Sequence, residues 1–176
     1  RDYGPWTCLM PSKNMLPEYS MSNSTAVVLP LPSGIARLED FVCFYNSLNA
    51  DNLNGLGQIY HPDVVFTDPV HEIHGLPALH DYFAHAYARL TQSHFEPKHM
   101  AAQGNMGFVS WQMRIRHPAI ANGNQILVDG CSELRWHDNG LIIAHRDYYD
   151  LTQMVYQHLP VIGWLTSKVK QQMAKE

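Results

Sequence analysis

This sequence of 176 residues is poor in charge, with 16% charged residues and a formal net charge of −4. It has no run of basic residues beyond Lys168 and Lys170, whereas nucleic-acid-binding proteins need a basic stripe, so that class of partner is excluded. The longest apolar stretches, Ala26 to Leu31 and Val161 to Leu165, are far shorter than the ~20 residues of a membrane-spanning helix. We therefore expect no nucleic-acid partner and no stable membrane insertion.

Cysteine is also scarce, because Cys8, Cys43 and Cys131 are the only three, lie far apart and form no C-x-x-C pair. This pattern favours reduced, structural thiols in a cytoplasmic protein over a disulfide framework. A signal peptide is not indicated, since the apolar segment around Val28 lacks a basic flank and is broken by Pro30.

The length fits one domain that is large enough to bury a core. Helical periodicity begins near Ile35, so we expect a flexible N-terminal extension over residues 1–34 and a single domain over residues 35–176. Met21 is a candidate for the authentic start.

The pattern of apolar residues then changes from helical spacing to strand alternation. We expect helices over residues 35–49, 53–60 and 76–90, strands over 64–67, 71–74, 94–103, 108–117, 125–136 and 141–150, and a helical tail after 151 that Pro160 and Gly163 kink or split. The four long strands follow one another without helical crossovers, which favours antiparallel pairing. Helices first and a strand meander last indicate the α+β class.

Strand alternation predicts which side chains face the interior. The expected inward faces carry Val109, Trp111, Met113 and Ile115 in one strand, Ile126, Val128, Ser132, Leu134 and Trp136 in the next, and Leu141, Ile143, His145, Asp147 and Tyr149 in the last. Polar groups on such faces are exceptions, because burying them unpaired costs roughly 1–3 kcal/mol. Ser132, His145 and Asp147 are therefore candidates to line a cavity.

Three short motifs carry a resemblance to a known family. They are the segment 44–51 (FYNSLNAD), the segment 66–70 (FTDPV) and Gly75 before the third expected helix. In this order and spacing, they resemble the SnoaL-like and ketosteroid-isomerase-like branch of the nuclear-transport-factor-2-like superfamily. The resemblance implies a cone-shaped α+β barrel, in which a curved antiparallel sheet wraps around three N-terminal helices and a deep apolar pocket, with an extra C-terminal helix here. It also implies a homodimer that pairs through the sheet.

The resemblance also implies a chemistry. In ketosteroid isomerases the aspartate that matches Asp68 shuttles a proton between two carbons, and the tyrosine that matches Tyr45 hydrogen-bonds the enolate oxygen. Such a site needs a base and preorganised donors where negative charge develops. The second acid of that oxyanion hole falls at Ser132, a weaker donor. Two alternatives stay open: Asp68 before Pro69 could simply end a strand, and Tyr45 could be a satisfied core phenol.

The last strand, with the sequence HRDYYD over residues 145–150, also resembles limonene epoxide hydrolases, in which an aspartate matching Asp147 activates water. The supporting charged residues of that site are absent, since the neighbouring strand offers Trp111 and Met113 on its inward face. Asp147 could instead pair with His99 or His145, or merely anchor the sheet.

A metal site is not expected, although the chain has 11 histidines. His71 and His74 fit no helical H-E-x-x-H motif, and His80 and His85 are five residues apart on a helix. We expect ligand contacts from residues that line the interior or its mouth: His71, Tyr82, Trp111, Met113, Ser132 and His145.

The sequence thus predicts a protein that binds a lipophilic small molecule and needs no cofactor. The favoured activity is proton transfer next to a carbonyl, with Asp68 as base, Tyr45 as oxyanion donor and Asp147 as a further polar group. The alternative is a ligand-binding or scaffold protein of the same fold without catalysis. The tail fits a flap, a dimer contact or a membrane-surface helix.

Overall fold

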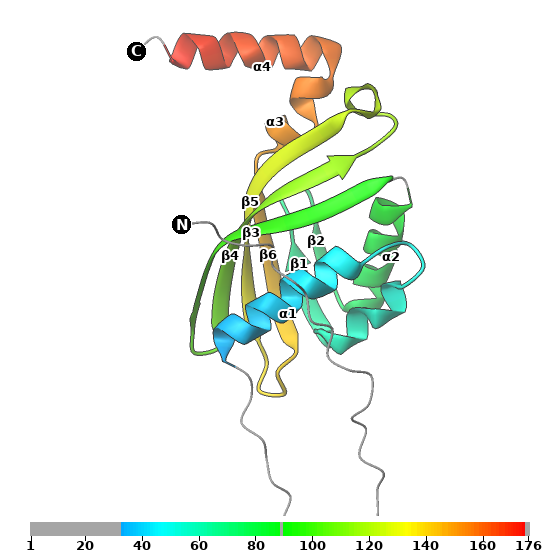
Figure 1. Ribbon diagram of the computed structural model, residues 1–176, viewed down its shortest axis with the longest axis vertical. Helices are drawn as coiled ribbons and strands as arrows, with labels where there is room; N and C mark the ends of the chain where they lie inside the picture. Colours follow the sequence, from blue (N-terminus) through cyan, green and yellow to red (C-terminus); the bar gives the residue numbers. More distant parts are fainter. Residues whose placement is uncertain (1–32, 89, 175–176) are drawn as a thin grey trace, which may run out of the picture.

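The computed structural model describes residues 33–88 and 90–174, which form a curved six-stranded sheet with helices packed on it (Figure 1). The elements, in chain order, are α1 (Gly34–Ser47), η1 (Leu53–Gln58), β1 (Tyr60–Thr67), β2 (Glu72–His74), α2 (Leu76–Tyr87), β3 (Gln92–Gln103), β4 (Met106–Arg116), η2 (Ala121–Gly123), β5 (Gln125–Trp136), β6 (Ile142–Tyr149), α3 (Leu151–Met154), η3 (Tyr156–His158) and α4 (Pro160–Met173). Most of the predicted N-terminal extension, including Met21, lies outside these residues. Only its last two residues, 33 and 34, lie within them.

The strand order is β2-β1-β6-β5-β4-β3. The four long strands β3 to β6 pair antiparallel, as predicted. Strand β1 runs parallel to β6, which brings the N-terminal part of the domain alongside the last strand. The predicted α+β cone is therefore confirmed, but its sheet stays open, with β2 and β3 at its edges.

Helix α1 crosses the sheet and packs on β3 and β4 (Figure 1). The Ser33 hydroxyl caps it by accepting a hydrogen bond from the Ala36 N–H at 3.2 Å. Its buried face consists of Leu38, Phe41, Val42 and Tyr45, at the predicted helical spacing. This packing places the Tyr45 hydroxyl inside the cone.

The second predicted helix is wrong in type and extent. Residues Leu53–Gln58 form a 3-10 helix, and Tyr60 is the first residue of β1 rather than the end of a helix. Pro62 lies within β1, where the pairing with β6 shifts register between Tyr60 and Val65. Proline is tolerated at such an irregularity, because no regular ladder hydrogen bond is lost there.

The predicted inward faces of β4 and β5 are confirmed, since all nine of their residues are buried. In β6 the prediction holds for His145, but Ile142 is buried in place of Leu141 and Ile143. A register shift opposite Arg135 and Trp136 causes this difference, because one extra residue in a strand reverses the faces before it.

The predicted reduced state holds for Cys131, which is a free thiol, but not for Cys43, which is disulfide-bonded. Disulfides are rare in the cytosol, so a cytoplasmic location stays a prediction. In the described part of the chain, no helix is long and apolar enough to cross a membrane.

Candidate active site

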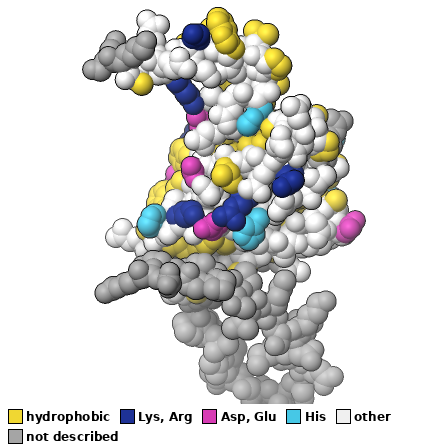
Figure 2. Space-filling view, turned by 45° about the horizontal axis from the view of Figure 1, so that its top comes forward, with side chains coloured by type: hydrophobic (Ala, Val, Ile, Leu, Met, Phe, Trp, Pro, Cys, Tyr) yellow, Lys and Arg dark blue, Asp and Glu magenta, His cyan; other side chains and the backbone are white. Residues whose placement is uncertain are grey.

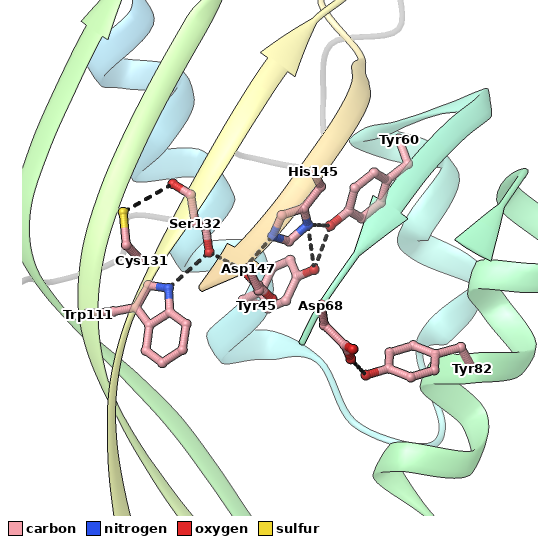
Figure 3. Close-up of polar contacts among 9 residues, drawn as sticks. All are labelled: Tyr45, Tyr60, Asp68, Tyr82, Trp111, Cys131, Ser132, His145 and Asp147. Carbon is pink, nitrogen blue, oxygen red and sulfur yellow. Dashed lines mark hydrogen bonds and ion pairs between the residues drawn. The ribbon is translucent and has the colours of Figure 1, made fainter. Parts of the chain in front are cut away.

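Six polar side chains inside the cone form one hydrogen-bonded chain, which we call the polar chain (Figure 3). Its members, in order of contact, are Tyr45 from α1, Tyr60 from β1, His145 and Asp147 from β6, Ser132 from β5 and Trp111 from β4. Four strands and one helix thus supply one connected set of polar groups inside a largely apolar core.

The tyrosine end of the polar chain is fully buried. The Tyr45 and Tyr60 hydroxyl oxygens lie 2.5 Å apart, and the Tyr60 oxygen lies 2.6 Å from His145 Nδ1. On the other side of the imidazole, Nε2 lies 2.8 Å from Asp147 Oδ1. The His145 ring is 0% exposed, so these contacts satisfy both of its nitrogens without water.

The directions of these hydrogen bonds follow from Asp147. An ionised carboxylate only accepts, so the proton between His145 and Asp147 belongs to Nε2. In neutral His145, Nδ1 then accepts from the Tyr60 hydroxyl, and the Tyr60 oxygen accepts from the Tyr45 hydroxyl. Every donor in this half of the polar chain therefore points towards Asp147.

Ser132 and Trp111 complete the polar chain from the opposite side. The Ser132 hydroxyl donates to Asp147 Oδ1 at 2.5 Å and accepts from Trp111 Nε1 at 2.9 Å. The Trp111 ring lies over Gly130, where a Cβ atom would come within 2.2 Å of it. A glycine at this position therefore lets the indole reach Ser132.

Burial raises the pKa of Tyr45 well above its ordinary value, and the nearby Tyr60 hydroxyl and the Asp147 charge raise it further. The pKa of Tyr60 is also raised well above its ordinary value, with burial as the main cause. Both phenols therefore keep their protons, and they act as hydrogen-bond donors rather than as bases.

Asp147 is held by one oxygen only. Both of its hydrogen bonds, from His145 and Ser132, end on Oδ1, and none reaches Oδ2 within the described part of the chain. Its side chain is 16% exposed. Two residues further along β6, the Tyr149 hydroxyl also makes no hydrogen bond to any described residue. An acceptor and a donor are thus left available next to each other on one strand face.

A second carboxylate, Asp68, follows β1 and is bound on both oxygens. Its Oδ1 accepts from the backbone N–H groups of Val70 at 2.7 Å and His71 at 2.6 Å. Its Oδ2 accepts from the Tyr82 hydroxyl of α2 at 2.6 Å, and the His71 ring lies within 3.3 Å of both oxygens. This arrangement closes the turn between β1 and β2 and ties it to α2.

The ionised form of Asp68 is favoured by these contacts. Burial works to raise its pKa, but the hydrogen bonds from Tyr82 and from the Val70 and His71 N–H groups outweigh burial, and the net pKa is lower than usual. In the same contact, burial and the Asp68 charge raise the pKa of Tyr82 well above its ordinary value.

Phe66 separates Asp68 and its partners from the polar chain. Its ring centroid lies 4.9 Å from that of His145 and 5.3 Å from that of Tyr82. Figure 3 shows Asp68 and Tyr82 apart from the polar chain, and no hydrogen bond joins Asp68 to Tyr45. The two residues predicted to act together are thus bound to different partners.

The remaining predicted ligand contacts have mixed positions. Met113 is buried in the core, and Trp111 is buried with its Nε1–H donated to the Ser132 hydroxyl. The His71 side chain is half exposed beside Asp68. Asp147 pairs with His145, whereas the other predicted partner, His99, is exposed on β3. The sequence analysis missed Tyr60, because it assigned this residue to a helix, and Tyr149, although alternation placed it on the correct face.

Two surface depressions in the described part of the chain lie away from the polar chain and from Asp68. One, of about 150 Å³, lies between α1, η1 and β5–β6 and includes Arg37, Phe41 and Trp136. The other, of about 340 Å³, lies around Leu90 and Pro118. The described residues also contain no group of three His, Cys, Asp or Glu side chains that could hold a metal ion.

Comparison with known proteins decides the family. Residues 42–145 match the SnoaL-like domain, a range that covers β1, β2, α2 and β3 to β5 and reaches His145. The chain belongs to the SnoaL-like domain family. No curated protein sequence matches it significantly.

Solved structures share the fold of this SnoaL-like protein at low sequence identity. A protein from Shewanella putrefaciens, provisionally named a SnoaL-like polyketide cyclase, is 16% identical with a TM-score of 0.60, over 71% of this chain and 95% of its own. A protein from Catenulispora acidiphila that is described as having a ketosteroid-isomerase-like fold, in complex with trimethylamine, is 16% identical with a TM-score of 0.59, over 69% of this chain and 90% of its own. TerC, co-crystallised with polyporic acid, is 17% identical with a TM-score of 0.57, over 67% and 94%.

Proposed function

We propose that this SnoaL-like protein is a cofactor-free enzyme that transfers a proton at a carbon next to a carbonyl group of a lipophilic small molecule. The observation that carries the proposal is the asymmetry of Asp147, whose Oδ1 is held by two donors while Oδ2 accepts no hydrogen bond from a described residue. A general base needs this combination of a fixed orientation and an available lone pair.

In the proposed reaction, Asp147 Oδ2 takes a proton from the carbon next to the carbonyl. The electron pair of the broken C–H bond forms an enolate, and the Tyr149 hydroxyl donates a hydrogen bond to the enolate oxygen. Return of the proton from Asp147 to another carbon of the enolate gives an isomer. Alternatively, the enolate carbon attacks a second carbonyl of the same molecule, the C=O π bond opens to an alkoxide that takes the proton from Asp147, and a ring forms. The polar chain keeps Asp147 oriented during both steps.

The surroundings of Asp147 and Tyr149 indicate the substrate class. The Tyr149 ring lies 6.5 Å from that of Trp111, which in turn lies 5.3 Å from that of Phe95. Aromatic walls with a few polar groups favour a flat, apolar ligand such as a polyketide or steroid. The similar structures named as polyketide cyclases and as ketosteroid-isomerase-like support this class.

We propose Asp147 as the base in preference to Asp68, which the sequence favoured. Asp68 accepts hydrogen bonds on both oxygens and has a lowered pKa, and each of these properties makes a carboxylate a weaker base. Tyr45, the predicted oxyanion donor, already donates towards Tyr60 and acts on Asp147 through His145.

A homodimer that pairs through the sheet is part of the proposal. The outer face of the sheet carries three exposed large apolar side chains, Phe108, Leu127 and Tyr148, on three neighbouring strands. Phe108 lies opposite Glu133 and Tyr148 opposite Cys131, so these side chains share one face of the sheet without forming one continuous patch. Single exposed apolar residues are common on protein surfaces, but several on one sheet face favour an interface.

The test is hydrogen–deuterium exchange of 2-tetralone, a small apolar ketone, in D₂O with NMR detection. We expect the wild type to accelerate exchange at the carbons next to the carbonyl, and Asp147→Asn to lower that acceleration by about 10²–10⁴-fold, as for loss of a general base. Thermal unfolding and circular dichroism of both proteins control for folding. Equal acceleration by wild type and variant would refute the assignment of Asp147.

Binding without catalysis is the second candidate, and the position of the two depressions favours it, because neither opens onto Asp147. A binding protein would retain a lipophilic ligand through purification, as native mass spectrometry can show, and yet would not accelerate exchange of that ligand in D₂O. Exchange of the retained ligand by wild type alone would rule this candidate out.

A further inference from the structure

Helix α4 protrudes from the end of the domain and makes most of its contacts with η3 (Figure 1). Its large apolar side chains are all at least 43% exposed, and Val161 is 76% and Trp164 63% exposed. The full set, which we call the tail face, consists of Val161, Ile162, Trp164, Leu165, Val169 and Met173. Figure 2 shows hydrophobic side chains gathered on this protruding part of the molecule.

Helical spacing brings these side chains together on one side of α4. Val161, Leu165 and Val169 follow each other at intervals of four, and Trp164 and Lys168 form a parallel row beside them. The tail face is therefore one side of the helix, with Lys168 one turn beyond Trp164 and Leu165 on that same side, rather than a set of scattered residues.

The charge of this segment is opposite to that of the whole chain. Residues 151–174 contain Lys168 and Lys170 and no aspartate or glutamate, whereas the chain has a formal net charge of −4. The Lys170 Nζ lies 3.6 Å from an Asp150 carboxylate oxygen at the start of α3, and Lys168 makes no ion pair or hydrogen bond with any described residue. The cation next to the tail face is thus available to an anionic partner.

The attachment of α4 keeps the tail face exposed. A Cβ atom on Gly163 would come within 2.4 Å of the Gln157 carbonyl oxygen, so the backbones of α4 and η3 touch at this glycine. Gly163 is also the buried residue of α4. The helix therefore presents its glycine side to the domain and its apolar side to the surroundings.

We propose that the tail face docks on the surface of an anionic lipid bilayer, with α4 parallel to the membrane. An apolar helix face that carries tryptophan, with lysine beside it, is the pattern of interfacial helices. A second copy of the chain fits this face less well. In a symmetric pair, each Lys168 would meet a surface that contains no carboxylate. This inference does not rest on the proposed function. Docking in this way would place the end of β6, and with it Tyr149, near the lipid bilayer, in which lipophilic substrates dissolve.

The test is flotation of the full chain with lipid vesicles, either pure phosphatidylcholine or phosphatidylcholine with about 30% phosphatidylserine. We expect the wild type to bind the anionic vesicles at least about fivefold more strongly than the neutral ones, and Lys168→Gln to lower anionic binding by about fivefold. The triple variant Val161→Ser, Trp164→Ser, Leu165→Ser should lose about tenfold or more.

A matched control carries Ile35→Ser, which replaces an exposed apolar residue at the start of α1, beside the β3–β4 hairpin, and should leave vesicle binding unchanged. All replaced residues are exposed, so folding should persist, and circular dichroism checks this. Equal binding to both vesicle types, or no binding, would overturn the proposal. So would a concentration-dependent dimer of the wild type that the triple variant abolishes, because the tail face would then be an interface between copies.

Discussion

Asp68 and Asp147 are two carboxylates in the same cone, and the fold holds them in opposite ways. Asp68 accepts hydrogen bonds on both oxygens, from two backbone N–H groups of its own turn and from Tyr82. Asp147 accepts two hydrogen bonds on one oxygen, from His145 and Ser132, and none on the other among the described residues.

The difference follows from where each residue lies in the chain. Asp68 ends β1 just before Pro69, and an aspartate in such a turn can bind the N–H groups two and three residues ahead. Asp147 lies in the middle of β6, where its own backbone groups pair with β5, so its partners come from side chains across the sheet. The turn carboxylate thus accepts hydrogen bonds from N–H groups of its own turn. The strand carboxylate accepts them only from side chains of other residues, and one of its oxygens can bind a substrate.

Loss of His145 should have the largest effect on stability. His145→Leu leaves the Tyr60 hydroxyl without its acceptor and Asp147 Oδ1 without one of its two donors, and each buried polar group left unpaired costs about 1–3 kcal/mol. Urea denaturation followed by circular dichroism measures this cost. The matched control is His99→Leu on the exposed side of β3, for which we expect a change below about 0.5 kcal/mol. Similar losses in both variants would contradict the polar chain as a stabilising unit.

Removing the Asp68 carboxylate should lower the free energy of unfolding by less than the loss of His145 does. Asp68→Ala leaves two N–H groups and the Tyr82 hydroxyl without their acceptor, which costs about 2 kcal/mol. Asp68→Asn keeps an oxygen for the two N–H groups and should recover about half of this cost. Equal destabilisation by Asp68→Asn and Asp68→Ala in urea denaturation would show that Asp68 does not stabilise the fold through the hydrogen bonds of its turn.

Tyr82→Phe should cost less than Asp68→Ala, about 1.5 kcal/mol at neutral pH, and this cost should depend on pH. Because the pKa of Asp68 is lowered in the folded state, its ionisation stabilises the fold above the ordinary aspartate pKa of about 3.9. This stabilisation is lost as the pH falls through the lowered folded-state pKa. Tyr82→Phe removes one cause of the lowered pKa, so the difference from wild type should shrink below about pH 4.

Urea denaturation between neutral and acidic pH tests this dependence. The control is Tyr148→Phe, which removes a tyrosine–carboxylate hydrogen bond to Glu133 on the exposed face of the sheet. We expect Tyr148→Phe to change stability by less than about 0.5 kcal/mol. A Tyr82→Phe effect that is constant from neutral to acidic pH would show that Asp68 is not ionised in this contact.

Much of the fold could be predicted from the sequence, because strand alternation fixes which face is buried. Ser132, His145 and Asp147 were found as polar residues on apolar faces, and the structure joins them. Tyr60 was missed because Pro62 breaks the strand pattern, and only the pairing with β6 defines the strand there. The hydrogen bond between Asp68 and Tyr82 could not be predicted either. It depends on how α2 packs against β1, which the sequences of the two segments do not specify.

The division of roles between the two carboxylates is tested most directly by comparing Asp147→Asn with Asp68→Asn in the 2-tetralone exchange assay. At neutral pH, we expect Asp68→Asn to keep the wild-type acceleration within a few-fold, and Asp147→Asn to lose about 10²–10⁴-fold. The reverse order, with Asp147→Asn active and Asp68→Asn inactive, would contradict the account and return the role of base to Asp68.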